Sequence, residues 1–324
     1  MMRRFLIVLA LAACVMPAPL AVAQERAGQT ERVTRSVNIG ANGELEIANI
    51  SGDITVTRGG GTSASIEAVK TARSGSADDA RALLSLVQVD IIERGTRVEV
   101  RTRYPEGDEL RRNNRRNVDV SVAIKVAAPE GTRVTVKSIS GNISVQDISG
   151  PLTLETVSGS VRMANAGRTA NGRSISGNID LMDTRVDGAL EAGSVSGNVR
   201  LRRVAARSVT ANSVSGNILL EDVDTERVNA QVISGTVTFS GNIDPNGRYE
   251  LASHSGNVMV TVPAAAGFQV EASSFSGSIN TDIPITMSGS QSGRRNRTLR
   301  GTVGSGGALL ELTTFSGSIV IKKQ

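Results

Sequence analysis

The stretch LTLETVSGSVRM at residues 152–163 decides the fold, because its pattern returns along most of the chain. Residues 209–220 read VTANSVSGNILL, with the same Ser-Gly step set between apolar residues. Aligned on the glycine, apolar residues stand seven, five and two positions before it and two and four positions after it. The glycines that anchor these blocks are Gly52, Gly141, Gly159, Gly177, Gly197, Gly216, Gly235, Gly256, Gly277 and Gly317.

The spacing of these blocks predicts a repeat fold. From Gly141 to Gly277 successive glycines are 18 to 21 residues apart, and we count the last step of 40 residues as two turns. Of the 50 aligned positions 47 are apolar, and Gly172, His254 and Thr281 are the exceptions. Apolar residues two apart are typical of strands, whereas a helix needs returns at three and four.

Each block therefore predicts two short strands joined at the Ser-Gly step. Such a unit cannot bury its apolar face alone, so it must stack on its neighbours. We predict an all-β protein, a single β-solenoid with coils of about 19–20 residues. All five apolar columns are expected inside this β-helix-like stack, with Ser, Gly and Asn at one edge.

Three segments depart from the repeat within the predicted solenoid domain, residues 36–324. An N-terminal excursion over about 57–125 contains a short helix at 77–86 and a hairpin over 87–104 that turns at Arg94-Gly95. Residues 105–117 read as an exposed loop, and an Arg-rich insertion spans about 287–307. Residues 24–35 are expected to be a disordered tail.

The N-terminus predicts export. Residues 1–23 have the basic, apolar and small-residue regions of a signal peptide, with Arg3 and Arg4 first and Ala21-Val22-Ala23 last. A second reading is a lipobox at Leu11-Ala12-Ala13-Cys14, which would make Cys14 a lipidated N-terminus. Either reading places the protein in the periplasm or at the cell surface. No later apolar stretch is long enough for a transmembrane helix.

Composition excludes several classes of function. The 324 residues include one His and one Cys, too few for a Cys/His zinc site or a disulfide framework. Aromatic residues make up 2%, which leaves no stacking platforms for single-stranded nucleic acid. We therefore predict no nucleic-acid partner, no cofactor and no metal site.

Two runs of sequence resemble a known family. VAAPEGTRVTVKSISGNISV (126–145) and LRGTVGSGGALLELTTFSGSIVI (299–321), with the SVSGN blocks between them, are similar to a bacterial β-strand-repeat family of unknown function. The resemblance covers about residues 36–324, and members of that family are usually called adhesins. It implies an envelope-associated repeat protein, and it carries over no catalytic residue.

A second functional class is an enzyme. Asp147, Asp183 and Asp222 stand six residues after their corner glycines, and stacked carboxylates can cleave polysaccharide. Asp before a turn also caps backbone amides, and nothing marks one serine as a nucleophile for His254. We predict a non-enzymatic envelope or surface protein of unknown ligand, adhesin-like or structural. A glycan-degrading β-helix enzyme and a modulator of envelope-stress signalling remain the alternatives.

Two arginine clusters are the candidate contacts for a partner. Eight arginines gather in two short stretches, which favours an anionic envelope component such as lipid, lipopolysaccharide or an acidic glycan. The residues are Arg111, Arg112, Arg115, Arg116, Arg294, Arg295, Arg297 and Arg300.

Replacing either cluster with serines tests this hypothesis. Because such contacts are electrostatic, retention on heparin or anionic liposomes should fall in the variants and should weaken with salt in the native protein. Thermal stability should stay nearly unchanged. Retention of both variants equal to that of the native protein would contradict the hypothesis.

Overall fold

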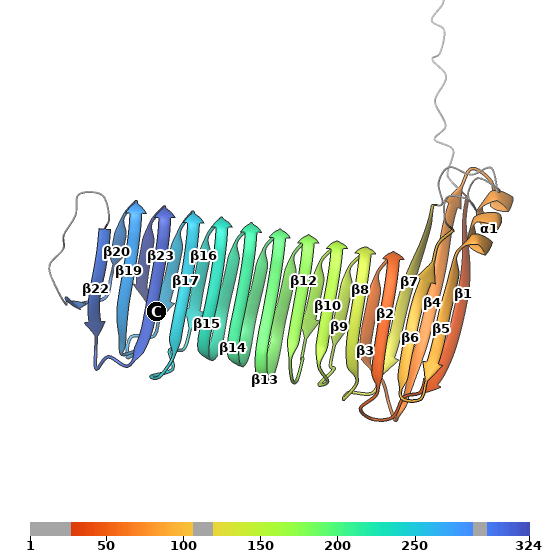
Figure 1. Ribbon diagram of the computed structural model, residues 1–324, viewed down its shortest axis with the longest axis horizontal. Coiled ribbons are helices and arrows are strands. Elements are labelled where there is room, and N and C mark those ends of the chain that lie inside the picture. The colour runs from red at the N-terminus through yellow and green to blue at the C-terminus, as the bar shows by residue number, and fades with distance from the viewer. Residues whose placement is uncertain (1–26, 106–118, 288–296) are drawn as a thin grey trace, which may run out of the picture.

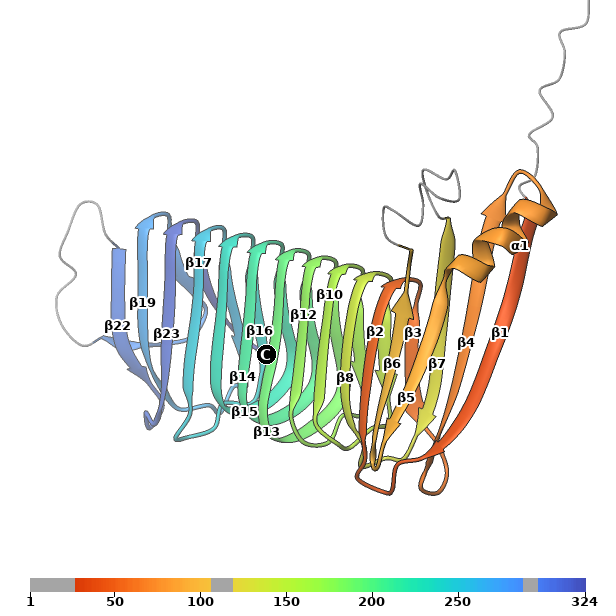
Figure 2. The same cartoon turned by 45° about the vertical axis from the view of Figure 1, so that its right-hand side comes forward.

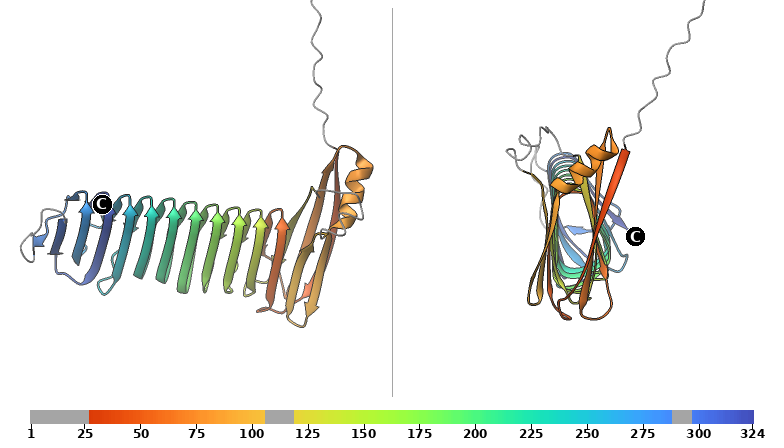
Figure 3. Two further views of the ribbon diagram at one scale, coloured as in Figure 1. Left: turned by 45° about the horizontal axis from the view of Figure 1, so that its top comes forward. Right: turned by 90° about the vertical axis from the view of Figure 1, so that its right-hand side faces the viewer.

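The computed structural model describes residues 27–105, 119–287 and 297–324. They form a long rod in which 24 strands make one continuous sheet, folded into two facing layers (Figures 1 and 2). The view along the rod shows the two layers as opposite sides of a flattened coil (Figure 3). This confirms the predicted all-β, β-solenoid-like architecture.

We call the two layers wall A and wall B. Wall A contains the strands that lead into the corner glycines, together with strands that extend this layer at the ends of the rod. In stacking order they are β5 (Gln88–Arg94), β6 (Arg97–Arg103), β2 (Glu44–Ser51), β8 (Arg133–Ser140), β10 (Leu152–Ser158), β12 (Ala170–Ser176), β17 (Arg248–Ser255), β23 (Ala308–Ser316), β19 (Phe268–Ser276), β22 (Arg297–Val303) and β21 (Thr286–Met287).

Wall B contains the strands that leave the corners and three antiparallel or mixed strands at the N-terminal end. They are β1 (Ala27–Asn38), β4 (Ser63–Ser74), β7 (Val120–Ala128), β3 (Ile54–Arg58), β9 (Ile143–Gln146), β11 (Val161–Ala164), β16 (Val237–Gly241), β18 (Val258–Val262), β24 (Ile319–Lys323) and β20 (Ile279–Thr281). Three long strands run from wall B through a second bend into wall A: β13 (Ile179–Ser196), β14 (Val199–Ser215) and β15 (Ile218–Ser234).

The core lies between the walls and consists of four stacked columns. They are the predicted positions seven and five before each corner glycine and two and four after it. In the central coil, for example, Val209, Ala211, Ile218 and Leu220 are buried. Parallel pairing in register, such as Leu152 with Ala170, keeps like positions of successive coils side by side.

The corner itself is fixed by the close approach of successive glycines. A Cβ on Gly216 would lie 2.1 Å from the carbonyl oxygen of Gly197, and the φ of Gly216 is +151°. The residues directly after the corner glycines form a second ladder. In it, the side-chain oxygen of one coil accepts a hydrogen bond from the backbone N–H of the following coil. Asn198 accepts from Asn217, and Asn217 accepts from Thr236, both at 2.9 Å. Glycine is therefore a geometric requirement of the corner, and an Asn or Asp oxygen directly after it adds a hydrogen bond between coils.

The N-terminal excursion has the predicted helix and hairpin. The helix α1 (Ala77–Leu86) begins at Ser76, whose side chain accepts a hydrogen bond from the backbone N–H of Asp79. Its apolar face buries Leu83 and Leu84. Strands β5 and β6 pair antiparallel around the turn that contains Gly95. The predicted loop over 105–117 lies outside the described residues from position 106 onward.

Two expectations differ from the structure. Residues 27–35, expected in a disordered tail, belong to β1, because β4 offers an open edge with which β1 pairs antiparallel over its full length. The 40-residue step is not two successive turns. Strand β22 pairs antiparallel with one edge of β19, so β23 can pair only with the other edge and inserts between β17 and β19.

The close contact at the corner predicts that one added methyl group there lowers the stability of the protein substantially. Gly216→Ala should lower the free energy of unfolding by about 2 kcal/mol, because the new Cβ collides with backbone rather than with a movable side chain. Gly193→Ala is the matched control, since its Cβ would meet no atom closer than 4.0 Å. Urea denaturation that gives the two variants equal stability would contradict this account of the corner.

Candidate functional site

An apolar stripe runs along the outside of wall A. The residues two positions before the corner glycines, expected in the core, point away from it, with side chains 38 to 54% exposed in nine of the ten coils. The tenth is His254, which is also exposed. The expectation that all five apolar columns are internal is therefore wrong for this one. In stacking order the nine are Ile50, Ile139, Val157, Ile175, Val195, Val214, Ile233, Phe315 and Phe275.

Strand alternation explains why this column is outside. The residues seven and five positions before the corner glycine face inward. By alternation the residue three positions before it (position three) must also face inward, and the residue two positions before it (position two) must face outward. Position three is mostly Ser or Thr, and its hydroxyl donates to the corner carbonyl of the preceding coil. Ser174 bonds to Gly159 and Ser194 to Gly177, both at 2.9 Å. This alternation could have been predicted from the sequence, but an apolar residue at position two suggested burial instead.

The stripe becomes aromatic toward the C-terminal end of the rod. The ring of His254 stacks on that of Phe315 with centroids 4.9 Å apart, and Phe315 stacks on Phe275 at 4.7 Å. The insertion of β23 between β17 and β19 brings these three rings together. His254 is thus an exposed member of the stripe.

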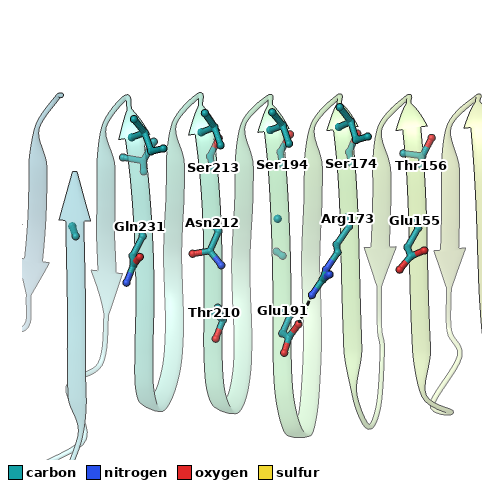
Figure 4. A pocket seen from close by; sticks show the side chains of 18 of the residues that line it. Glu155, Thr156, Arg173, Ser174, Glu191, Ser194, Thr210, Asn212, Ser213 and Gln231 are labelled. Atoms are coloured by element: carbon teal, nitrogen blue, oxygen red, sulfur yellow. Dashed lines mark hydrogen bonds and ion pairs between the residues drawn. The ribbon is translucent and has the colours of Figure 1, made fainter. Parts of the chain in front are cut away.

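A groove of about 980 Å³ lies beside the stripe on the outer face of wall A. Stripe residues from Val157 to Phe315 line it together with the outward side chains of the same strands. Figure 4 shows the hydroxyl row of Thr156, Ser174, Ser194 and Ser213, with a second row of longer polar side chains below it. That second row includes Glu155, Arg173, Asn212 and Gln231.

The charges along the groove compensate one another. The ammonium nitrogen of Lys137 lies 3.9 Å from Glu155, and Arg173 donates to Glu191 at 3.3 Å. These pairs join adjacent coils on wall A. The groove therefore combines an apolar side with a polar floor of balanced charge.

Gly193 interrupts the polar floor. It stands between Arg173 and Asn212 in register, on the outward face. The corner glycines are required by backbone contacts, but a side chain on Gly193 would enter open space. Glycine inside a strand is unfavourable, and it often marks a place where a ligand approaches the backbone closely.

The aspartates considered as catalytic carboxylates lie at the second bend of the coil, in a column of residues that we call the bend column. Asp147, Asp183 and Asp222, with Asn165 and Arg203 in the same column, have φ values of 50° to 58°. This left-handed conformation is one that Asp and Asn adopt more readily than most residues. The structure thus supports the turn interpretation of this column.

Arg203 separates the two candidate catalytic carboxylates. Its guanidinium donates to both oxygens of Asp183, at 2.5 and 2.9 Å, and lies between Asp183 and Asp222 in the stack. These hydrogen bonds hold the pKa of Asp183 below its ordinary value. The general acid of a glycosidase needs a raised pKa, so the lowered pKa disfavours Asp183 in that role.

Other predicted contacts are only partly described. Six of the eight clustered arginines lie outside the described residues; Arg297 and Arg300 lie exposed on β22. Arg300 is 3.7 Å from Glu271, so part of its charge is compensated. The described residues contain no group of three or more His, Cys, Asp or Glu placed to hold a metal ion.

Comparison with known proteins gives the family. A family model described as Toastrack DUF4097 matches residues 44–322. The chain belongs to this family. A search of curated proteins finds no match.

Solved structures similar to this Toastrack chain share little sequence with it. A "putative adhesin" from Bacteroides fragilis is 13% identical, with 91% of this chain and 97% of that chain covered and a TM-score of 0.43. A "putative lipid binding protein" from Parabacteroides distasonis is 13% identical, with 90% and 96% covered and a TM-score of 0.45. A "putative cell adhesion protein" from Clostridium sporogenes is 9% identical, with 91% and 100% covered and a TM-score of 0.26.

The bend column makes its own prediction. Asp222→Ala should lower the free energy of unfolding by about 1 kcal/mol, because alanine lacks the local hydrogen bonding that offsets the left-handed conformation. Asp222→Asn is the matched control and should change stability little, as Asn165 already occupies this column. Thermal denaturation in which the Asn variant loses as much stability as the Ala variant would contradict a purely conformational role.

Proposed function

We propose that the protein is an exported, non-enzymatic binding module of the cell envelope, whose ligand lies along the groove of wall A. The observation that carries this proposal is the exposed apolar stripe. Nine Val, Ile and Phe residues, each 38 to 54% exposed, form one apolar row along the rod. The largest apolar patch of an ordinary monomer covers about 300–600 Å² and is often functional.

Two observations support the non-enzymatic part of the proposal. The paired carboxylates of the alternative glycan-degrading enzyme belong to the bend column, where Arg203 stands between them in the stack and lowers the pKa of Asp183. The serines three positions before the corner glycines are also occupied: Ser213 and Ser253 donate to corner carbonyls at 3.1 and 2.9 Å. A hydroxyl held as a donor to the backbone has no base beside it to activate it as a nucleophile.

The envelope location rests on the N-terminal sequence. Arg3, Arg4 and the apolar run that follows support export, and cleavage after Ala23 would leave β1 close to the new N-terminus. Among the residues described, no helix is long and apolar enough to cross a membrane.

Binding of the apolar dye ANS tests whether the stripe is a binding surface. The triple variant Ile175→Ser, Val195→Ser, Val214→Ser should lose most of the ANS fluorescence of the native protein. Its thermal midpoint should change by only a few degrees, because the three side chains are already about half exposed.

Met182→Ser is the matched control, since Met182 is 38% exposed but lies outside the stripe. Equal ANS fluorescence in the triple variant and the native protein would contradict the proposed function.

A further inference from the structure

We infer that the ligand of the groove is one long, unbranched acyl chain of a monomeric amphiphile, lying along wall A across successive coils. This inference rests on the proposed function and names its ligand class. It follows from the hydrogen bonds, charges, shape and length of the groove.

Hydrogen bonding beside the stripe favours an apolar chain over an extended peptide. The hydroxyls beside the stripe already donate to corner carbonyls, as Ser174 and Ser194 do to Gly159 and Gly177. The backbone groups of wall A are paired with the coils on either side. An extended peptide would find no free backbone partner there, whereas an acyl chain needs none.

Charge selects against a strongly charged occupant. Lys137 pairs with Glu155, and Arg173 pairs with Glu191, so the two basic and two acidic groups along this part of the floor cancel. Binding a chain of charges here would break these pairs without a compensating partner. A methylene chain leaves them intact.

The floor offers close approach at Gly193. An added Cβ there would meet no heavy atom nearer than 4.0 Å, so the space above this residue is empty on the groove side. Ala252, three coils further along wall A, contributes only a methyl group to the lining. A thin, unbranched chain can lie against the sheet at these positions, where a longer side chain would lift it away.

The length of the groove also suits one acyl chain. From Lys137 on β8 to Phe315 on β23 the lining of the groove covers seven strand spacings, or about 34 Å. One acyl chain spans about 15 Å in half of a bilayer core. One such chain therefore fits within the groove, and the stripe continues past the last lining residue, Phe315, to Phe275.

A second copy of the chain fits the groove less well. A two-fold contact brings the same surface of each subunit together, so the surface must be complementary to itself. Two hollow faces placed against each other would enclose a channel and leave part of each apolar stripe uncovered. The hollow shape therefore favours a separate ligand.

The test measures displacement of ANS from the full-length protein by saturated fatty acids of 8, 12 and 16 carbons, each below its critical micelle concentration. Affinity should rise about two- to fourfold for each added methylene, the upper value corresponding to complete removal from water. Native mass spectrometry should show one 16-carbon chain per protein.

The variant Gly193→Val separates binding from folding. It should keep or raise the thermal midpoint, because valine favours strands, and should weaken the affinity for the 16-carbon acid at least tenfold. Gly188→Val is the matched control: Gly188 lies on the same strand outside the groove, its Cβ would meet atoms no closer than 3.5 Å, and the affinity should be unchanged.

Three results would overturn the inference while leaving the proposed function standing. One is ANS binding at the stripe with fatty-acid affinity that does not depend on chain length. Another is retention on neutral phosphatidylcholine vesicles without binding of monomeric acids. The third is a ligand-free dimer, seen by sedimentation, that the triple serine variant dissociates. ANS fluorescence that is equal in the native protein and in the triple serine variant would instead contradict the proposed function.

Discussion

The contact between successive corner glycines is the constraint on which the rest of the structure depends. Each corner brings the Cα of one coil so close to the glycine oxygen of the preceding coil that a Cβ would lie about 2 Å from it at Gly159 and Gly216. Because no side chain fits, the coils can stack at the strand spacing along the whole edge. Asn and Ser at the next position then tie each coil to the following one by a side-chain hydrogen bond.

The same corner determines what wall A shows to solvent. Most corner carbonyl oxygens accept a hydrogen bond from a hydroxyl of the following coil, as Gly177 does from Ser194 and Gly197 from Ser213, and those hydroxyls must face inward to reach them. The residue between the hydroxyl and the corner serine is then forced outward. Burial cannot account for Val, Ile or Phe at this position, and their recurrence in nine coils supports the proposed role in binding.

Much of the fold could be predicted from the sequence because the repeat is strict. The spacing of the glycines predicted the length of the coils, and the composition of ADDARALLSL predicted the helix at Ala77–Leu86. The strand β1 forms because it pairs with the edge of β4, which lies further along the chain. No local pattern in AGQTERVTRSVN predicts this pairing. The place of β23 depended on which edge of β19 was already occupied. Both are long-range events that periodicity does not encode.

The candidate site was harder to predict than the fold. An apolar residue is ordinarily interpreted as core, and Val195 or Ile233 looks no different from Leu190 in the alignment of repeats. The distinction lies in strand alternation. Residues seven and five positions before the glycine lie on the same face of the strand, and the residue two positions before it lies on the opposite face. Gly193 was equally hidden, because only its open surroundings separate it from the corner glycines.

Thiol reactivity along one strand tests the central claim, that the corner turns the stripe outward, most directly. In a Cys14→Ser background the chain has no other cysteine, so Val195→Cys and Ser194→Cys can each be labelled with a maleimide under native conditions. Val195 is 45% exposed and Ser194 is 6% exposed. The account predicts labelling of Val195→Cys at nearly the rate of the unfolded chain and strong protection of Ser194→Cys. Protection of Val195→Cys with rapid labelling of Ser194→Cys would contradict it.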